Sequence, residues 1–365
     1  MGRLRAMIMK ELWAVLRDPR ARIVLFVPPL MQLFIFTFAS TLEVKNFDVG
    51  VLDRSGGRGA IELVSQMAGS PNVRDIVRLN SPEEVRDAIN KREVIAALII
   101  EPDFDAQLAK GHASAGLILD GRRSNASQIV ASYLQRIAAN AGMTLNPRMA
   151  AAPQGTVVRN WFNPNLEYIW FTIPALTVII AATTGMAISA QSVARERELG
   201  TFDQLMVSPL RVHEILIGKM APPVIIGMIN GTVFLAVGTL VFGVPYHGSV
   251  LLYYVSLFIY LLSLIGVGLF VSSLSQTQQQ AFLGMFAVSV PLIVLSGYSS
   301  PIENMPHWLQ IISEADPARH FLVITEGLFL KGMPVSDVMH SLYPLLIIAA
   351  VTLGLAAWLF RARME

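Results

Sequence analysis

The stretch that decides the fold is a charged segment between two long apolar runs, and it reads Arg195-Glu196-Arg197-Glu198-Leu199-Gly200-Thr201-Phe202-Asp203-Gln204-Leu205-Met206-Val207-Ser208-Pro209. Residues 168–194 before it contain no Asp, Glu, Lys or Arg, and residues 220–246 after it contain none either. Charges held between two such runs are expected at a membrane face, where they reach water. The sequence therefore predicts a membrane protein in which this segment faces an aqueous compartment.

Composition extends this prediction to the whole chain. Of its 365 residues, 53% are hydrophobic and only 15% are charged, whereas a soluble domain has about 25% charged residues. A helix needs roughly 20 apolar residues to cross about 30 Å of hydrocarbon. On this criterion the sequence predicts six transmembrane helices, at residues 23–42, 168–190, 221–243, 250–272, 280–299 and 342–360. The first is expected to be an uncleaved helix, because the mixed segment before it is too long for a signal peptide.

The distribution of basic residues predicts the orientation of these helices. Residues 1–22, 191–220 and 361–365 hold six, four and two Lys or Arg, whereas residues 244–249 and 300–341 hold only Arg319 and Lys331. Basic residues concentrate in cytoplasmic loops. Both termini and the 191–220 loop are therefore expected in the cytoplasm, and the 300–341 loop at the opposite interface.

The first long loop, residues 43–167, is predicted to be an exported α/β domain. Strands that alternate with helices are typical of a small, mostly parallel sheet. Ser81-Pro82-Glu83-Glu84 has the pattern of a capping box that opens a helix. Residues 144–166 are expected to return irregularly to the membrane. The expected strands are residues 48–53, 73–79, 94–100 and 117–120, and the expected helices are residues 61–67, 82–91, a short one after 102, and 124–141.

Residues 3–18 have the period of a basic amphipathic helix, and the apolar stripe also includes Glu11. Such a helix beside a span lies in the membrane interface. The pattern fits a positive-inside anchor and a specific docking role equally well. We therefore assign residues 1–22 to a cytoplasmic amphipathic helix and leave its role open.

Several kinds of chemistry lack a motif in this sequence. There is no G-x-x-x-x-G-K-[ST] loop for ATP, no H-E-x-x-H zinc motif, no G-x-S-x-G nucleophile and no cysteine. We expect no catalytic residue, no metal site and no cofactor in this chain, which is therefore predicted not to be an enzyme. The predicted spans hold no ionisable side chain away from their ends, which argues against a secondary transporter. The net charge of +2 implies no affinity for nucleic acid.

Two interpretations of residues 195–209 remain open on physical grounds. Its charges either mark the membrane border, or they flank an apolar helix face that docks into a groove of a cytoplasmic partner. Gly200-Thr201 would then allow a bend before the docking helix. That face would consist of Leu199, Phe202, Leu205 and Met206.

Two separated motifs carry a resemblance to a known family. One is Arg195-Glu196-Arg197-Glu198-x-Gly200-Thr201-x-x-Gln204-Leu205-x-x-Ser208-Pro209. The other is Ser296-Gly297-x-x-x-Pro301-Ile302-Glu303-Asn304-Met305-Pro306-x-Trp308-Leu309, followed by Asp316-Pro317 and Phe329-Leu330-Lys331-Gly332. Both motifs resemble those of the ABC-2 type transporter permeases. The chain departs from the family at Asp203, where Glu is usual, and at Asp316, where Asn is usual. The long insert is similar to that of bacterial multidrug or large-molecule exporters.

This resemblance implies an α-helical integral membrane protein of the bacterial inner membrane, with six transmembrane helices and an α/β periplasmic domain inserted between helices 1 and 2. Residues 168–365 would form a five-helix transmembrane domain with the coupling loop 191–220 and the interfacial loop 300–341. The protein would be an exporter permease subunit in contact with membrane lipid. A membrane sensor with a periplasmic ligand-binding domain and a secondary transporter are the alternatives.

The resemblance also implies partners. A separate ATP-binding cassette ATPase, which carries ATP and Mg, would dock on the first cytoplasmic loop. A second permease subunit, identical or paralogous, would complete a dimer, and a periplasmic adaptor and an outer-membrane channel would follow. The implied ATPase-coupling residues are Arg195, Glu196, Arg197, Glu198, Gly200, Thr201, Phe202, Gln204, Leu205, Ser208 and Pro209.

Overall fold

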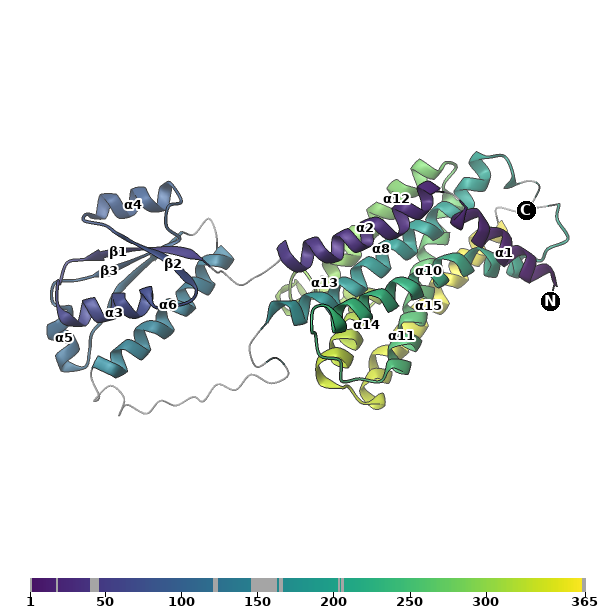
Figure 1. Ribbon diagram of the computed structural model, residues 1–365. Coiled ribbons are helices and arrows are strands. Elements are labelled where there is room, and N and C mark those ends of the chain that lie inside the picture. Colours follow the sequence, from purple (N-terminus) through teal and green to yellow (C-terminus); the bar gives the residue numbers. More distant parts are fainter. Residues whose placement is uncertain are drawn as a thin grey trace. The chain divides into compact units, whose positions relative to one another are not determined.

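The computed structural model describes residues 2–17, 19–39, 46–120, 124–145, 163, 167–202, 204 and 207–362. The chain forms two compact units, one of Met1–Ser40 with Asn160–Glu365 and one of Thr41–Arg159. The first unit is helical and the second contains a sheet (Figure 1).

Long helices build the first unit. Between α12 and α15 the chain forms four short helical segments, η2 (Ile302–Asn304), α13 (His307–Ser313), α14 (Pro317–Glu326) and η3 (Gly327–Lys331). The longer helices are α1 (Gly2–Leu16), α2 (Pro19–Ala39), α8 (Tyr168–Glu198), α10 (Val212–Leu240), α11 (Val250–Leu274), α12 (Gln278–Leu295) and α15 (Val335–Ala362).

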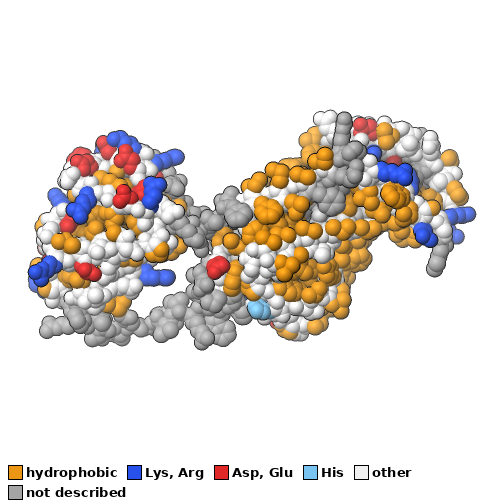
Figure 2. Space-filling view, in the orientation of Figure 1, with side chains coloured by type: hydrophobic (Ala, Val, Ile, Leu, Met, Phe, Trp, Pro, Cys, Tyr) orange, Lys and Arg blue, Asp and Glu red, His pale blue; other side chains and the backbone are white. Residues whose placement is uncertain are grey.

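Among the described residues, five helices are long and apolar enough to cross a membrane: α8, α10, α11, α12 and α15. They coincide with the last five predicted spans, so the chain is a multi-pass helical membrane protein. The first predicted span falls on α2, whose apolar stretch Val27–Thr37 is shorter. Hydrophobic side chains cover much of the visible face of this unit, and basic ones gather at its α1 end (Figure 2).

The segment predicted as a loop over residues 191–220 is mostly helical. α8 continues to Glu198 and α10 begins at Val212. Charged residues extend a helix as readily as apolar ones, so α8 ends only where Gly200 adopts a left-handed φ of +67°. Hydropathy therefore located the membrane-crossing part of each helix but not the helix ends.

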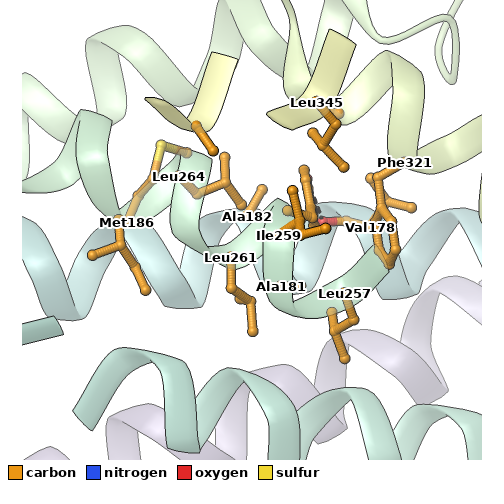
Figure 3. Close-up of a cluster of buried hydrophobic side chains, with 14 of the residues drawn as sticks. Val178, Ala181, Ala182, Met186, Leu257, Ile259, Leu261, Leu264, Phe321 and Leu345 are labelled. Atoms are coloured by element: carbon orange, nitrogen blue, oxygen red, sulfur yellow. Dashed lines mark hydrogen bonds between the residues drawn. The ribbon is translucent and has the colours of Figure 1, made fainter. Parts of the chain in front are cut away.

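α8 and α11 form the centre of the helical unit, and α11 also packs against α15 and α14. Figure 3 shows side chains from these helices meeting in one apolar cluster, among them Val178, Leu261 and Phe321. Tyr260 stacks on Phe321 at 4.4 Å between ring centroids, and its hydroxyl donates to the Val178 carbonyl at 3.1 Å. Pairing the hydroxyl allows a tyrosine to be buried here.

Small residues permit the closest helix contacts. A Cβ added to Gly266 of α11 would lie 2.8 Å from the Leu353 backbone nitrogen of α15. A Cβ at Gly231 of α10 would lie 2.3 Å from Leu257 of α11. A Cβ at Gly227, one turn earlier, would lie 2.5 Å from Leu261, so the two glycines of Gly227-x-x-x-Gly231 let α10 approach α11 closely.

The second unit holds a four-stranded sheet in the order β2-β1-β3-β4. β1 pairs in parallel with β2 and β3, whereas β4 is antiparallel to β3. One apolar core involves α3 and α6, and a second involves α4. The elements are β1 (Phe47–Asp53), α3 (Arg58–Ala68), β2 (Val73–Arg78), α4 (Pro82–Asn90), β3 (Ala96–Ile100), α5 (Phe104–Lys110), β4 (Gly116–Leu119) and α6 (Ser124–Leu145).

These strands and helices overlap those predicted for this part of the chain. The predicted start of α4 is confirmed, since Ser81 Oγ accepts a hydrogen bond from the Glu84 amide at 3.2 Å. Glu84 in turn accepts from the Asn80 amide at 2.8 Å. Most of the expected return segment, 144–166, lies outside the described residues.

Asp316 is a buried carboxyl between α13 and α14. Its Oδ1 accepts a hydrogen bond from the Ala318 amide at 2.8 Å and so caps α14. Its Oδ2 is buried and accepts no hydrogen bond from any described residue. Burial raises the pKa of Asp316 to about 7, although the Ala318 amide and Arg319 act in the opposite direction.

Gly266→Ala is expected to separate α11 from α15 and to lower the midpoint of thermal unfolding, because overpacking a core costs about 1–3 kcal/mol. Gly354→Ala on α15 is the control, since an added Cβ there meets nothing within 4 Å. Unfolding of detergent-solubilised protein is followed by intrinsic fluorescence. Equal midpoints for the two variants would contradict this packing.

Asp316→Asn is expected to reduce the dependence of stability on pH. The carboxyl titrates near 3.8 when unfolded and near 7 when folded, so the stability it contributes is full at low pH and is lost as pH rises through 7. Asn keeps an oxygen that can cap α14. The thermal unfolding midpoint is measured at pH 5 and at pH 8 for both proteins. If the difference between the two midpoints is the same in the variant as in the unmodified protein, Asp316 is not the source of the pH dependence.

Candidate functional site

The charged motif forms the last turn of α8. The Leu199 amide donates to the Arg195 carbonyl at 3.0 Å, and the Thr201 amide donates to the Glu196 carbonyl at 2.9 Å. Gly200 adopts its positive φ between them. The bend expected at Gly200-Thr201 therefore lies where α8 ends.

Glu196 lies at the centre of a charge cluster, which we define as Lys10, Glu11, Glu196 and Lys219. Its Oε1 lies 2.8 Å from Lys10 Nζ and its Oε2 lies 3.0 Å from Lys219 Nζ. Glu11 Oε1 completes the cluster, 3.2 Å from Lys10 Nζ and 3.6 Å from Lys219 Nζ. The cluster joins α1, α8 and α10 through side chains that are far apart in the sequence.

The charge cluster is largely shielded from water. The Lys219 side chain is 0% exposed, those of Glu11 and Glu196 are 12% and 11% exposed, and that of Lys10 is 55% exposed. Burial lowers the pKa of Lys10, but its hydrogen bonds to Glu196 and Glu11 and their charges outweigh this and raise the pKa overall. Lys219 also donates to the Ser192 carbonyl at 3.4 Å. Two positive and two negative groups therefore compensate one another inside the protein.

Arg197 ties the end of α8 to α11. Its Nη1 donates to the carbonyls of Ser273 and Ser275 at 2.8 and 3.1 Å. Its guanidinium also lies 4.9 Å from the ring centroid of Phe202, whose edge meets the ring of Phe360 in α15. A charge and an aromatic ring of the motif thus stabilise the helix bundle itself.

Two further contacts fasten α8 to its neighbours. Glu198 Oε2 accepts a hydrogen bond from the Gln278 amide at the start of α12, at 2.8 Å. Ser272 Oγ of α11 accepts from the amides of Val193 and Ala194 at 2.9 and 3.0 Å. Two amides of α8 directly before the charged motif therefore bind a side chain of another helix.

The segment after α8 is the exposed part of the motif. Leu199 is 63% exposed and Val207 is 87% exposed, and Gly200, Gln204 and Pro209 are exposed as well. Thr201, Phe202 and Ser208 are half-buried. Arg3 of α1 donates to the Pro209 carbonyl at 3.1 Å. Leu205 and Met206, which were expected on the docking face, lie outside the described residues.

A pocket of about 440 Å³ opens beside the charge cluster. It lies between α1, α8 and α10 and reaches the start of α12. Its lining comprises Lys10, Glu11, Ala14, Val15, Ala187, Ile188, Gln191, Ser192, Arg195, Glu196, Leu199, Thr201, Lys219, Pro222, Pro223 and Gln278. Among the described residues there is no group of three or more His, Asp or Glu that would hold a metal ion.

Sequence reasoning identified Glu196 but not its partners. Lys219 was placed in a loop, whereas it lies in the second turn of α10 and is buried. Lys10 was one of the basic residues of the N-terminal helix. The one signal in the sequence was Glu11, an acidic residue that occupies a position on the apolar stripe of that helix and is buried in the structure.

Comparison with known proteins gives consistent relatives. The profile of the ABC-2 family transporter proteins matches residues 22–358. The chain is 42% identical to the probable multidrug ABC transporter permease YbhR of Escherichia coli (strain K12), over 99% of each chain. It is 30% identical to the probable multidrug ABC transporter permease YbhS of the same strain, over 98% of this chain and 96% of the relative. It is 22% identical to the linearmycin resistance permease protein LnrN of Bacillus subtilis (strain 168), over 96% of this chain and 97% of the relative.

Lys219→Met is expected to destabilise the helical unit strongly, because removing one partner of a buried ion pair costs about 3–5 kcal/mol. The double variant Lys219→Met/Glu196→Gln should recover part of this loss, since Lys10 and Glu11 then balance each other. Thermal unfolding in detergent measures both.

The control for these variants is Arg54→Gln, which breaks the exposed pair with Glu101 at 3.4 Å. An exposed pair contributes about 0–1 kcal/mol. If Lys219→Met is as stable as this control, the charge cluster does not hold the three helices together.

Proposed function

The chain belongs to the ABC-2 family of transporter proteins, and from this we propose that it is the membrane-spanning permease subunit of an ABC exporter driven by a separate ATPase. Its permease relatives are transport components, and no motif for ATP hydrolysis occurs in this sequence. ATP and Mg would bind to the partner chain.

The observation that carries the proposal is that an exposed segment directly follows residues that are fixed by buried ionic contacts. Leu199 and Val207 present apolar side chains to the surrounding solvent. The residues just before them are fixed by the charge cluster and by Arg197. We propose that the ATPase binds residues 199–209 together with α1. The charge cluster and Arg197 would then transmit the movement of the ATPase to the spans.

In this mechanism, the roles of the motif residues differ. Gly200, Gln204 and Pro209 lie at the surface that the ATPase would contact, whereas Glu196 is buried and would act as a positioning residue. Movement of the segment would shift α8 and α10 together, because Glu196 and Lys219 link them at 3.0 Å. A second permease subunit, identical or paralogous, would provide the other half of the pathway.

The proposal includes a topology with six spans. α2 has 21 residues, and residues 23–39 of it contain no charged side chain; at about 1.5 Å per residue these give roughly 26 Å, which is near the lower limit for a span. With α2 as the first span and both termini cytoplasmic, the Thr41–Arg159 unit would lie in the periplasm of a bacterium. There it would be available to an adaptor that leads to an outer-membrane channel.

Leu199→Asp and Val207→Asp are expected to abolish binding of the ATPase, because a carboxylate would be buried in an apolar contact. Each variant is co-expressed with the ATP-binding cassette subunits of the same organism and purified through a tag on the permease. The amount of ATPase retained and its activity in lipid nanodiscs are measured.

Ile61→Asp in α3 is the matched control, because Ile61 is 61% exposed and lies in the other unit. It should retain the ATPase as the unmodified permease does. Full retention by both Leu199→Asp and Val207→Asp would exclude this segment as the docking surface.

A further inference from the structure

The pocket beside the charge cluster has the size and lining of a ligand site. Its volume of about 440 Å³ falls within the range of roughly 300–1,000 Å³ for pockets that bind small molecules. One part of the wall is apolar and the other is charged. The apolar part is formed by Ala14, Val15, Ala187, Ile188, Pro222 and Pro223.

The four members of the charge cluster are not equally held. Glu11, Glu196 and Lys219 are almost completely buried, whereas the Lys10 side chain is 55% exposed. Lys10 is therefore the member that can leave the cluster by rotating into solvent. Its departure would leave two carboxylates facing a single ammonium group, and one more positive charge would restore the balance.

One buried hydroxyl that lines the pocket has unused hydrogen-bonding capacity. Ser192 Oγ is buried and forms no hydrogen bond with a described residue. Glu196 Oε2 is paired by charge with Lys219 Nζ at 3.0 Å, whereas Glu196 Oε1 is the oxygen that Lys10 contacts. A buried hydroxyl without a partner favours a ligand with a polar group.

We propose that this pocket binds amphiphiles whose only charged group is one ammonium, with the ammonium taking the place of Lys10 between Glu11 and Glu196. The apolar part of the ligand would contact the apolar wall. Lys10 thus acts as a built-in competitor that keeps the charge cluster neutral when no ligand is bound. The inference rests on the proposed transport function, for which it names a class of substrate.

The charges around the pocket disfavour anionic and uncharged headgroups. Arg195 also lines the pocket, but it already interacts with other residues of the chain. An anionic headgroup near the charge cluster would meet Glu11 and Glu196, whose carboxylates are fixed by burial. An uncharged headgroup would leave Lys10 in place and would gain no ionic contact. Only a monocation exchanges for Lys10 without changing the net charge of the cluster.

The test uses three dansyl probes of similar length with the full-length permease in phosphatidylcholine nanodiscs, without nucleotide or ATPase. They are N-dansyl-1,10-diaminodecane, which carries one ammonium, N-dansyldecylamine, which has no charged end, and 11-(dansylamino)undecanoic acid, which carries a carboxylate. Val15→Trp fills the pocket without altering a charge, so binding that survives in this variant measures partition into lipid.

We expect the unmodified permease to bind the ammonium probe about tenfold tighter than the uncharged one, a factor that corresponds to about 1.4 kcal/mol. Val15→Trp should remove this difference. Lys10→Gln should bind the ammonium probe about tenfold tighter still, because the competitor is gone. A purely structural role of Lys10 predicts unchanged or weaker binding. Lys110→Gln in α5, an exposed lysine of the other unit, should leave all affinities unchanged.

Three results would overturn the inference: equal affinities for the three probes, tighter binding of the carboxylate probe, or displacement of the ammonium probe by phosphatidylethanolamine at equal concentration, which would identify a lipid headgroup site. If Lys10→Gln does not fold, the comparison of the unmodified permease with Val15→Trp still decides. Because no ATPase is present, a negative result here leaves the docking of the ATPase on residues 199–209 unaffected, and the reverse also holds.

Discussion

A fully buried ammonium group must be compensated by nearby carboxylates, and Lys219 imposes this constraint on the helical unit. The compensation comes from Glu196 at the end of α8 and from Glu11 on α1. The start of α10, the end of α8 and the N-terminal helix are therefore held in one arrangement. The exposed segment between α8 and α10 is consequently attached to a rigid base at both of its ends.

In the proposed function, this arrangement would let a chain without an ATP-binding motif respond to a separate ATPase. Apolar contacts between helices are non-directional, whereas the charge cluster and the bonds of Arg197 fix particular atoms against each other. A displacement at Leu199 would thereby be passed to three helices together. The same groups also border the pocket, so in the two proposals the coupling to the ATPase and the recognition of a ligand depend on one set of side chains.

Local patterns in the sequence were sufficient for much of the fold. Apolar runs located five of the spans, and Ser81 marked the start of α4 because a capping box involves only neighbouring residues. The candidate site depended on contacts that no local pattern encodes. Lys10 and Glu196 are 186 residues apart. Lys219 was predicted to lie in a solvent-exposed loop, because the charged ends of α8 and α10 were taken as part of that loop. The burial of Asp316 was likewise invisible, since Asp before Pro is also a normal helix start at a surface.

One hydroxyl fastens α8 to α11 close to one end of α8. Ser272 Oγ accepts from the amides of Val193 and Ala194, whereas the helix runs from Tyr168 to Glu198. The attachment is therefore off-centre, with a short charged arm on one side and a long apolar arm on the other. If α8 tilts as one body about this contact, a small swing at Glu198 gives a larger displacement at the far end of the helix, near Tyr168.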